Sequence, residues 1–466
     1  MIASVGKYHK LSIVLVLLSA FVYYYFGYPL VRTDLVILIS LYGIAFASFF
    51  GLIRLEKNNF LFLAGIAIGF RLIFLGSIPN LSQDFYRFIW DGRLLLQGWN
   101  PYLYLPNDLM ANGTVPIQES QALFDGMGSL NASHYTNYTP INQLCFVLAG
   151  IISPKSITGA VIVLRLILIL ADLGTLYFGR KLLKNMGLST HAIWLFVLNP
   201  LVIIELVGNL HFEGLMIFFL VWSLYLLQKG LWKWAAVVLA LSVSVKLLPF
   251  IFLPILFQWF SKCKIMEIHK TSRSVLKKNI GKLIVFYAIV FAIVIGLFLP
   301  FISEKFISNY QETIGLYFQN FEFNASLYYI ARWIGYQIVG WNMIATIGKI
   351  TPIVVFVSVL IISFFRDNTD FKKTMTALLF GLSIYFFTTT TMHPWYFTTL
   401  LALSVFTNYR FTVVWSFMFV LSYTAYQKEA YGEILGLVAL EYVIVYGYLA
   451  YEIVSLHRKK VQIQAS

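Results

Sequence analysis

The chain has 466 residues, of which 59% are hydrophobic and only 12% are charged, and its mean hydropathy is +0.78. Soluble domains carry roughly 25% charged residues, so this composition excludes an ordinary water-soluble fold. The net charge is +14, but the basic residues lie in short loops between apolar runs, where they orient membrane helices. No nucleic-acid partner is expected.

Apolar runs long enough to cross a bilayer recur along the chain and predict an all-α, polytopic transmembrane bundle of about fourteen crossings. An even number of crossings places both termini on one side, and the basic loops assign that side to the cytoplasm. The predicted spans are 11–31, 35–54, 60–79, 157–180, 191–208, 212–228, 232–247, 248–261, 282–301, 343–365, 374–391, 394–408, 411–427 and 433–456.

We expect residues 1–466 to form one transmembrane domain. Other segments interrupt its series of predicted spans. Residues 139–154 are apolar, but counting them as a span would put the basic cluster Arg180–Lys184 outside. We therefore expect a short or re-entrant helix there, with similar behaviour at 326–340. Residues 80–138 form the first large extracytoplasmic loop, 302–325 form the second, and 261–282 form a basic cytoplasmic loop. No internal repeat is evident, unlike in many transporters.

The first large loop opens with SQDFYRFIWDGRLLLQGWNPY at residues 82–102. The spacing of Asp84, Arg87 and Asp91 puts all three on one face of a helix. A carboxylate just outside a bilayer, beside arginine and tyrosine, is a plausible general base for a hydroxyl group. The alternative is an amphipathic interfacial helix whose acids only pair with its arginines.

This motif resembles the first extracytoplasmic loop of superfamily C glycosyltransferases, which are membrane enzymes that use polyprenyl- or dolichyl-phosphate sugars. It is most similar to mannosyltransferases related to the enzyme that adds the first mannose of GPI anchors, and to bacterial polyprenyl-phosphate-mannose-dependent enzymes. Further short matches follow in the same order along the chain: YTP at 138–140, NP at 199–200, GNLHFE at 208–213, SVKLLP at 244–249 and HPWYF at 393–397.

The resemblance implies that an acid of the first loop is the catalytic base, and the matching residue is Asp84. The leaving phosphate needs cationic partners, which matter most in a low-dielectric cavity. Lys246 has apolar neighbours at membrane depth, where a charge costs about 2.5–3.5 kcal/mol, so a phosphate-binding role is expected. The alternative is that it snorkels to the interface. Arg87 and Arg93 are further phosphate candidates by residue type, unless they pair with Asp84 or Asp91.

Several polar and aromatic residues are predicted to bind substrate at the same face. His211 and Glu213 lie at a tight turn between two spans, although such turns are also polar for solubility alone. His393 precedes another span and Trp395 lies at its start, and the two form either a sugar-binding surface or an aromatic belt. The remaining predicted substrate-binding residues are Tyr86, Asp91 and Tyr138. Asp84, Asp91, His211 and Glu213 could assemble a divalent site, but no ligand-spacing signature exists, so no metal or other cofactor is assigned.

The expected function is transfer of a hexose, with mannose the expected sugar, from a polyprenyl- or dolichyl-phosphate donor to a lipid or glycan acceptor. The active site would face the extracytoplasmic side of a membrane, with a bacterial inner membrane expected, and the displacement would be in-line with inversion. The alternative is a transporter or flippase for a lipid-linked or anionic solute. The enzymatic interpretation requires Asp84, Lys246, His211 and His393 to converge around one site.

Overall fold

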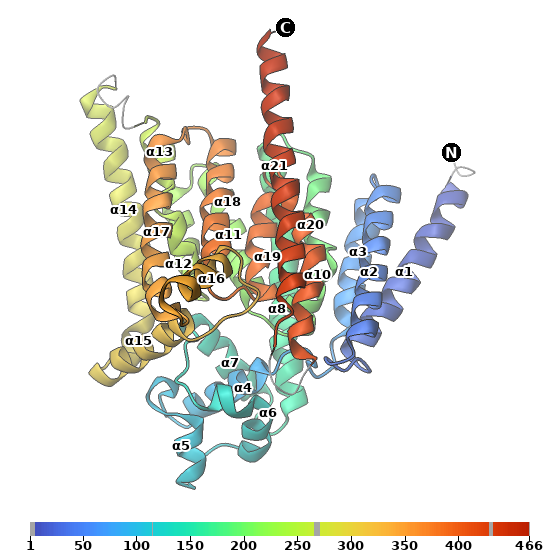
Figure 1. Ribbon diagram of the computed structural model, residues 1–466, viewed down its shortest axis with the longest axis vertical. Helices are drawn as coiled ribbons and strands as arrows, with labels where there is room; N and C mark the ends of the chain where they lie inside the picture. The colour runs from blue at the N-terminus through green and yellow to red at the C-terminus, as the bar shows by residue number, and fades with distance from the viewer. Residues whose placement is uncertain (1–4, 114, 265–270, 428–431, 466) are drawn as a thin grey trace.

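The computed structural model describes residues 5–113, 115–264, 271–427 and 432–465, and these form an α-helical bundle (Figure 1). Within these ranges no β-strand forms. The backbone makes one isolated parallel β-bridge there, between Phe323 and Thr391. Residues 265–270 of the predicted basic loop 261–282 lie outside the described residues. The all-α prediction is confirmed.

The helices follow one another along the chain with short connections. They are α1 (Val5–Gly27), α2 (Leu35–Leu55), α3 (Phe60–Ile73), α4 (Asp84–Leu96), η1 (Pro101–Leu103), α5 (Pro106–Ala111), α6 (Ser120–Ala132), α7 (Pro140–Ile152), α8 (Ile157–Asn185), η2 (Thr190–Ile193), α9 (Trp194–Val197), α10 (Pro200–Val202), η3 (Ile203–Gly208), α11 (Glu213–Gln228), α12 (Trp232–Val243), η4 (Leu248–Phe252), α13 (Leu256–Ser261), α14 (Arg273–Phe298), η6 (Leu299–Phe301), α15 (Glu304–Gln319), α16 (Leu327–Val339), α17 (Ile344–Phe365), α18 (Phe371–Thr388), α19 (Pro394–Ser404), α20 (Phe411–Met418), η7 (Phe419–Tyr426) and α21 (Leu435–Ala465).

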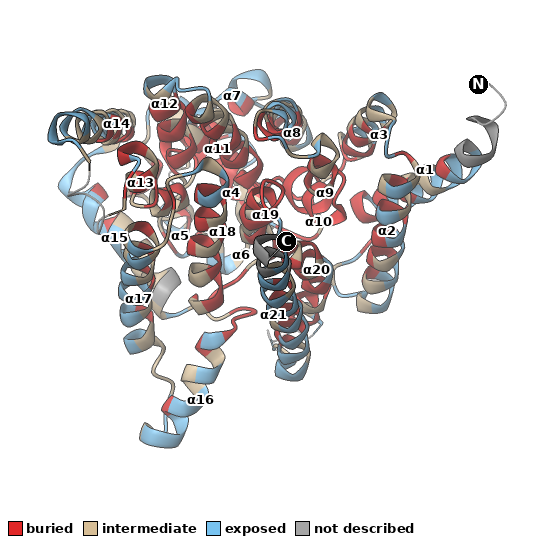
Figure 2. Ribbon diagram, turned by 90° about the horizontal axis from the view of Figure 1, so that it is seen from above, coloured by how far each residue is buried: buried red, intermediate tan, exposed pale blue. Residues whose placement is uncertain are grey.

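The outer surface of the bundle is apolar. Large hydrophobic side chains such as Val36 and Leu61 are 79% and 82% exposed, and many others point outward along α14, α17 and α21. Figure 2 shows the buried residues between the helices and exposed residues on their outer faces. Patches of this kind are not stable in water, so the protein is a multi-pass membrane protein.

Every predicted span coincides with one or more helices, but the number of crossings remains a prediction. Six helices among the described residues are long and apolar enough to cross a bilayer alone. A seventh candidate, Thr190–Val197 with Pro200–Gly208, is bent by 51° where Asn199–Pro200 interrupts it. The predicted span 248–261 is likewise divided, into η4 and α13, with Pro254 between them.

Helices α4, α5 and α6 form a layer at one end of the bundle, and both ends of the chain lie at the opposite end (Figure 1). Helix α7 has 13 residues, or about 20 Å, which is shorter than the roughly 30 Å hydrocarbon core of a bilayer. The predicted short helix at 139–154 is therefore present. Helix α16 stands apart from the bundle (Figure 2), with Trp333 and Ile338 exposed.

A buried ion pair joins α3 to α8. The Arg71 guanidinium donates to Asp172 at 2.7 Å and to the carbonyl oxygens of Ala67 and Val197. Both charged side chains are almost fully buried. We expect Asp172→Leu to lower the free energy of unfolding by about 3–5 kcal/mol, because it leaves a buried guanidinium without its counter-ion.

Thermal unfolding in detergent measures this effect. The double variant Arg71→Leu/Asp172→Leu should be more stable than Asp172→Leu alone, since it removes the unpaired charge. A single variant as stable as the wild-type protein would show that the pair contributes little.

Candidate active site

The first residue of α4, Asp84, lies where the layer of α4–α6 meets the bundle. Its position in the first turn suits a carboxylate, because the helix dipole stabilises negative charge there. The side chain is 27% exposed, and its closest polar neighbours are Asn131 Nδ2 at 3.4 Å and His211 Nε2 at 4.0 Å. Asp84 is therefore a reachable carboxylate with few constraints.

The neighbouring charges on α4 are used in packing. Arg87 Nε donates to Asp91 Oδ1 at 2.8 Å, and its Nη1 donates to the carbonyl oxygens of Asn131 and His134. Asp91 also accepts from Gln143 Nε2 on α7. The side chains of Arg87, Asp91 and Gln143 are buried. This arrangement matches the alternative in which the acids of the helix only pair with its arginines, and the predicted ligand-binding roles of Arg87 and Asp91 gain no geometric support.

Arg93 has a similar position at the other end of α4. Its Nη2 pairs with Glu119 at 2.9 Å, and its Nη1 donates to the Gln118 carbonyl oxygen at 2.7 Å. The partner is neither Asp84 nor Asp91, the two carboxylates considered from the sequence. The phosphate-binding role of Arg93 stays a prediction that the geometry does not favour.

Gly92 allows α4 to contact α7 closely. A Cβ atom at this position would lie 2.3 Å from the Phe146 carbonyl oxygen, a distance at which the backbones must separate. We expect Gly92→Ala to lower the free energy of unfolding by about 1–3 kcal/mol and to reduce activity, because α4 carries Asp84.

The matched control is Gly65→Ala in α3, where a Cβ atom would have no neighbouring atom within 4 Å. This substitution should be neutral or slightly stabilising. Equal melting temperatures for Gly92→Ala and wild type in detergent would contradict the close-packing argument.

Two predicted aromatic residues flank this layer. Tyr138 packs edge-on against Phe88 and Phe146, with its backbone carbonyl oxygen accepting from Tyr102. Tyr86 lies against Gly126 of α6, where any side chain would collide with the Tyr86 ring. Both tyrosines are half-buried and close to α4, so they border the site without a demonstrated ligand role.

His211 is held on one side by a buried carboxylate. Its Nδ1 lies 3.2 Å from Glu205 Oε2 and 2.9 Å from the Glu205 carbonyl oxygen. Glu205 also accepts from Asn209 Nδ2 at 3.2 Å and from the Tyr423 hydroxyl. Burial alone would lower the pKa of His211, but Glu205, Glu213 and Asp84 outweigh it and raise the pKa.

The HPWYF motif covers His211. The Trp395 indole stacks on His211 with centroids 3.8 Å apart and on His393 with centroids 4.4 Å apart, both nearly parallel. Two rings this close to one centroid cannot lie side by side, so they occupy opposite faces of the indole. Trp395 therefore has no free face on which a sugar could stack, and only its edge is available.

His393 remains neutral in this environment. Burial, together with the positive charges of His211 and Lys246, lowers the pKa of His393 to about 3. Its Nδ1 is buried and has no hydrogen-bond partner within the described part of the chain. Phe323, at the end of the second predicted loop 302–325, packs against the ring. The loop thus reaches the site through Phe323.

Lys246 completes the cluster. Its ammonium group pairs with Glu213, the first residue of α11, and lies 3.7 Å from the Tyr396 ring centroid. The Lys246 side chain is 38% exposed, whereas Glu213 is 6% exposed. An ammonium carries three donors, so the contact with Glu213 leaves others for an anionic ligand. Asp84, His211, His393 and Lys246 thus lie in one cluster.

Glu205, Asn209 and Tyr423 were not among the predicted site residues. Glu205 lies inside the apolar run 191–208, and a carboxylate at membrane depth is as costly as the lysine that was singled out. The same argument would have identified it. Tyr423 carries no comparable signal, because it lies among other aromatic residues.

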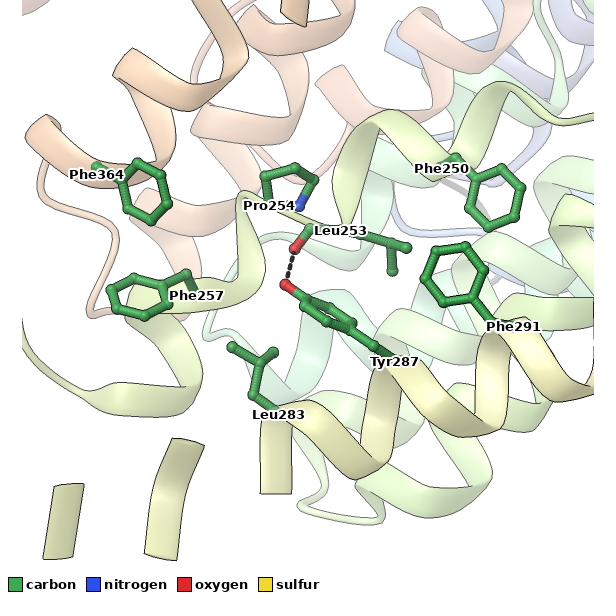
Figure 3. Close-up of a pocket in the computed structure, with 8 residues that line it drawn as sticks. All are labelled: Phe250, Leu253, Pro254, Phe257, Leu283, Tyr287, Phe291 and Phe364. Atoms are coloured by element: carbon green, nitrogen blue, oxygen red, sulfur yellow. Dashed lines mark hydrogen bonds between the residues drawn. The ribbon is translucent and has the colours of Figure 1, made fainter. Parts of the chain in front are cut away.

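A separate apolar cavity of about 400 Å³ lies between η4, α13, α14 and α17 (Figure 3). Its lining contains one hydroxyl group, that of Tyr287, which donates to the Leu253 carbonyl oxygen at 2.6 Å. Phe250 and Phe291 stack at one end and Phe257 and Phe364 contact at the other. The lining suits a hydrocarbon rather than a charged ligand.

No group of three or more His, Cys, Asp or Glu side chains in the described part of the chain is arranged to hold a metal ion. In particular, Asp91 faces Arg87 and Gln143 rather than His211.

Comparison with known proteins gives matches to one kind of enzyme. Residues 64–261 match the family described as alpha-(1->6)-mannopyranosyltransferase, N-terminal domain. Alpha-(1->6)-mannopyranosyltransferase A of Mycobacterium tuberculosis is 27% identical over 238 residues, which cover 50% of this chain and 43% of the relative. Alpha-(1->6)-mannopyranosyltransferase B of Corynebacterium glutamicum is 27% identical over 174 residues, which cover 36% and 28%.

The matched region therefore spans less than half of each of these relatives. It includes α4, the GNLHFE turn and Lys246, which are the elements that form most of the cluster described above. The resemblance to mannosyltransferases of superfamily C is confirmed.

Proposed function

Because this chain resembles the alpha-(1->6)-mannopyranosyltransferases over residues 64–261, we propose that it transfers mannose from a polyprenyl-phosphate donor to a lipid or glycan acceptor. The observation that carries the proposal is the pairing, in one cluster, of a reachable carboxylate with a reachable ammonium group. Asp84 is 27% exposed and Lys246 is 38% exposed, while the charges between them are buried.

In the proposed reaction, the acceptor hydroxyl gives its proton to Asp84 as its oxygen attacks the anomeric carbon. The bond from that carbon to the phosphate oxygen breaks, and its electron pair stays on the phosphate. Lys246 stabilises the developing negative charge, which is worth most in a site that excludes water. The displacement is in-line, with inversion at the anomeric carbon.

The apolar cavity of Figure 3 offers a place for the hydrocarbon tail of the donor. Its first lining residue, Phe250, follows Lys246 closely in the chain, so the phosphate and tail sites adjoin. We place the active site on the extracytoplasmic face of a bacterial inner membrane, with both termini cytoplasmic, because the basic clusters lie at the end of the bundle away from α4.

The test is a transfer assay with the purified protein in liposomes. Radiolabelled polyprenyl-phosphate mannose is the donor, and an alkyl mannoside is the acceptor. We expect labelled disaccharide product with release of polyprenyl phosphate. Intact labelled donor that moves between leaflets without forming product would support the transporter alternative and overturn the proposal.

A further inference from the structure

Behind the partly exposed Asp84 lies a buried carboxylate, Glu205, to which the proposed function gives no role. It is the only acidic residue of the described η3 turn (Ile203–Gly208), and it is 1% exposed. Its carboxylate receives hydrogen bonds from Tyr423 Oη, Asn209 Nδ2 and His211 Nδ1.

The contacts of His211 determine where its ring carries hydrogen. Nδ1 faces two acceptors, the side chain and the backbone carbonyl of Glu205, so Nδ1 must be protonated. Nε2 is consequently the position that gains or loses a proton. It is buried, has no hydrogen-bond partner among the residues that the structure describes, and lies 4.0 Å from Asp84 Oδ2.

The surrounding chain holds the imidazole in this orientation. Leu210 adopts φ = 62°, a left-handed conformation that costs a leucine about 1–2 kcal/mol. Arg165 donates to the carbonyl oxygens of Val207 and Gly208, at the end of the turn that carries Glu205. Trp395 covers one face of the ring. Backbone strain that is retained beside a fixed imidazole is typical of a functional site.

We propose that Glu205 is a positioning residue that fixes His211 to receive the proton from Asp84 after transfer. This step rests on the proposed function. The acceptor hydroxyl proton passes first to a carboxylate oxygen of Asp84 and then to His211 Nε2. The Asp84 carboxylate is thereby regenerated, and Glu205 stabilises the imidazolium that forms. Before the next turnover the imidazolium releases this proton to water, which restores the neutral ring.

The distance of 4.0 Å exceeds a hydrogen bond, as is common for catalytic pairs without substrate. Asp84 has room to approach His211. Among the described residues, its carboxylate accepts one hydrogen bond, a long contact of 3.4 Å from Asn131 Nδ2. The other titratable groups that act on His211 within the described chain are Glu213 on α11 and His393 before α19, and Lys246 after α12 acts in turn on His393.

The test is the pH dependence of transfer by Glu205→Gln. To accept a proton, His211 must start neutral, so activity should rise as pH increases through its pKa. The charge of Glu205 raises that pKa. Its removal should move the acid limb of kcat/KM about one pH unit lower and reduce the plateau kcat about 10²-fold, with donor KM unchanged.

The matched control is Glu441→Gln, the same change at a fully buried carboxylate bound by Trp415 and Asn324. It should keep the wild-type pH profile. If Glu205→Gln does not fold, His211→Asn is the second variant. The asparagine amide can still donate to Glu205, but it has no nitrogen that accepts a proton. The acid limb of the pH profile should therefore disappear in His211→Asn.

An unshifted acid limb in Glu205→Gln, or an acid limb that persists in His211→Asn, overturns the proton transfer from Asp84 to His211. Either result leaves transfer by the wild-type protein and its need for Asp84 unchanged. Absence of transfer by the wild-type protein would instead refute the proposed function. The two failures are therefore distinguishable.

Discussion

Asp84→Asn should reduce the rate of mannosyl transfer by about 10³-fold and leave donor affinity nearly unchanged. The amide has almost the same shape as the carboxylate and keeps the contact with Asn131, but it cannot accept the proton of the acceptor hydroxyl. Because the side chain is partly exposed and has no ion pair closer than 4.0 Å with any described residue, the substitution should not destabilise the fold. The loss should therefore fall on kcat.

The matched control is Asp108→Asn, an exposed carboxylate on α5 in the same layer. It should transfer at the wild-type rate. Donor affinity is measured separately, by binding of labelled donor to each variant. If Asp84→Asn retains full turnover, Asp84 is not the base; if it loses donor binding as well, the carboxylate contributes to recognition rather than to proton transfer.

The helices could be predicted from the sequence because membrane helices leave long apolar runs, and charge distribution gave a consistent orientation. The breaks were harder to predict. Asn199–Pro200 and Pro254 carry a clear proline signal, but the π-type turn that presents Glu205 has none. Such a turn depends on packing, here on Arg165, which donates to its carbonyl oxygens from α8.

The candidate site shows the same division. Lys246 and Asp84 could be found because their residue types are unusual at their depth or position. The partners of Arg87 and Arg93 could not, since the choice between a ligand and a protein carboxylate depends on the fold of α4 against α6 and α7. Trp395 was expected to offer a face to sugar, and only the structure shows that His211 and His393 cover both faces.

Lys246→Met should raise the donor KM by about 30- to 100-fold, which corresponds to about 2–3 kcal/mol for a lost hydrogen bond between two charged groups. Methionine keeps the length and apolar stem of lysine, so packing against Tyr396 is retained while the charge is lost. The rate should fall as well, because the same ammonium stabilises the departing phosphate. Lys305→Met is the control, since Lys305 also lies over a tyrosine ring but outside the cluster.

A double variant separates phosphate binding from simple neutralisation of Glu213. Lys246→Met leaves Glu213, 6% exposed, without its cation, so part of its defect could come from that unpaired carboxylate. Glu213→Gln/Lys246→Met removes both charges. If Lys246 serves only Glu213, the double variant should regain donor affinity and rate. If Lys246 binds the donor phosphate, stability should recover in thermal unfolding while the KM stays high, because no neutral pair can replace a cation that faces the leaving group.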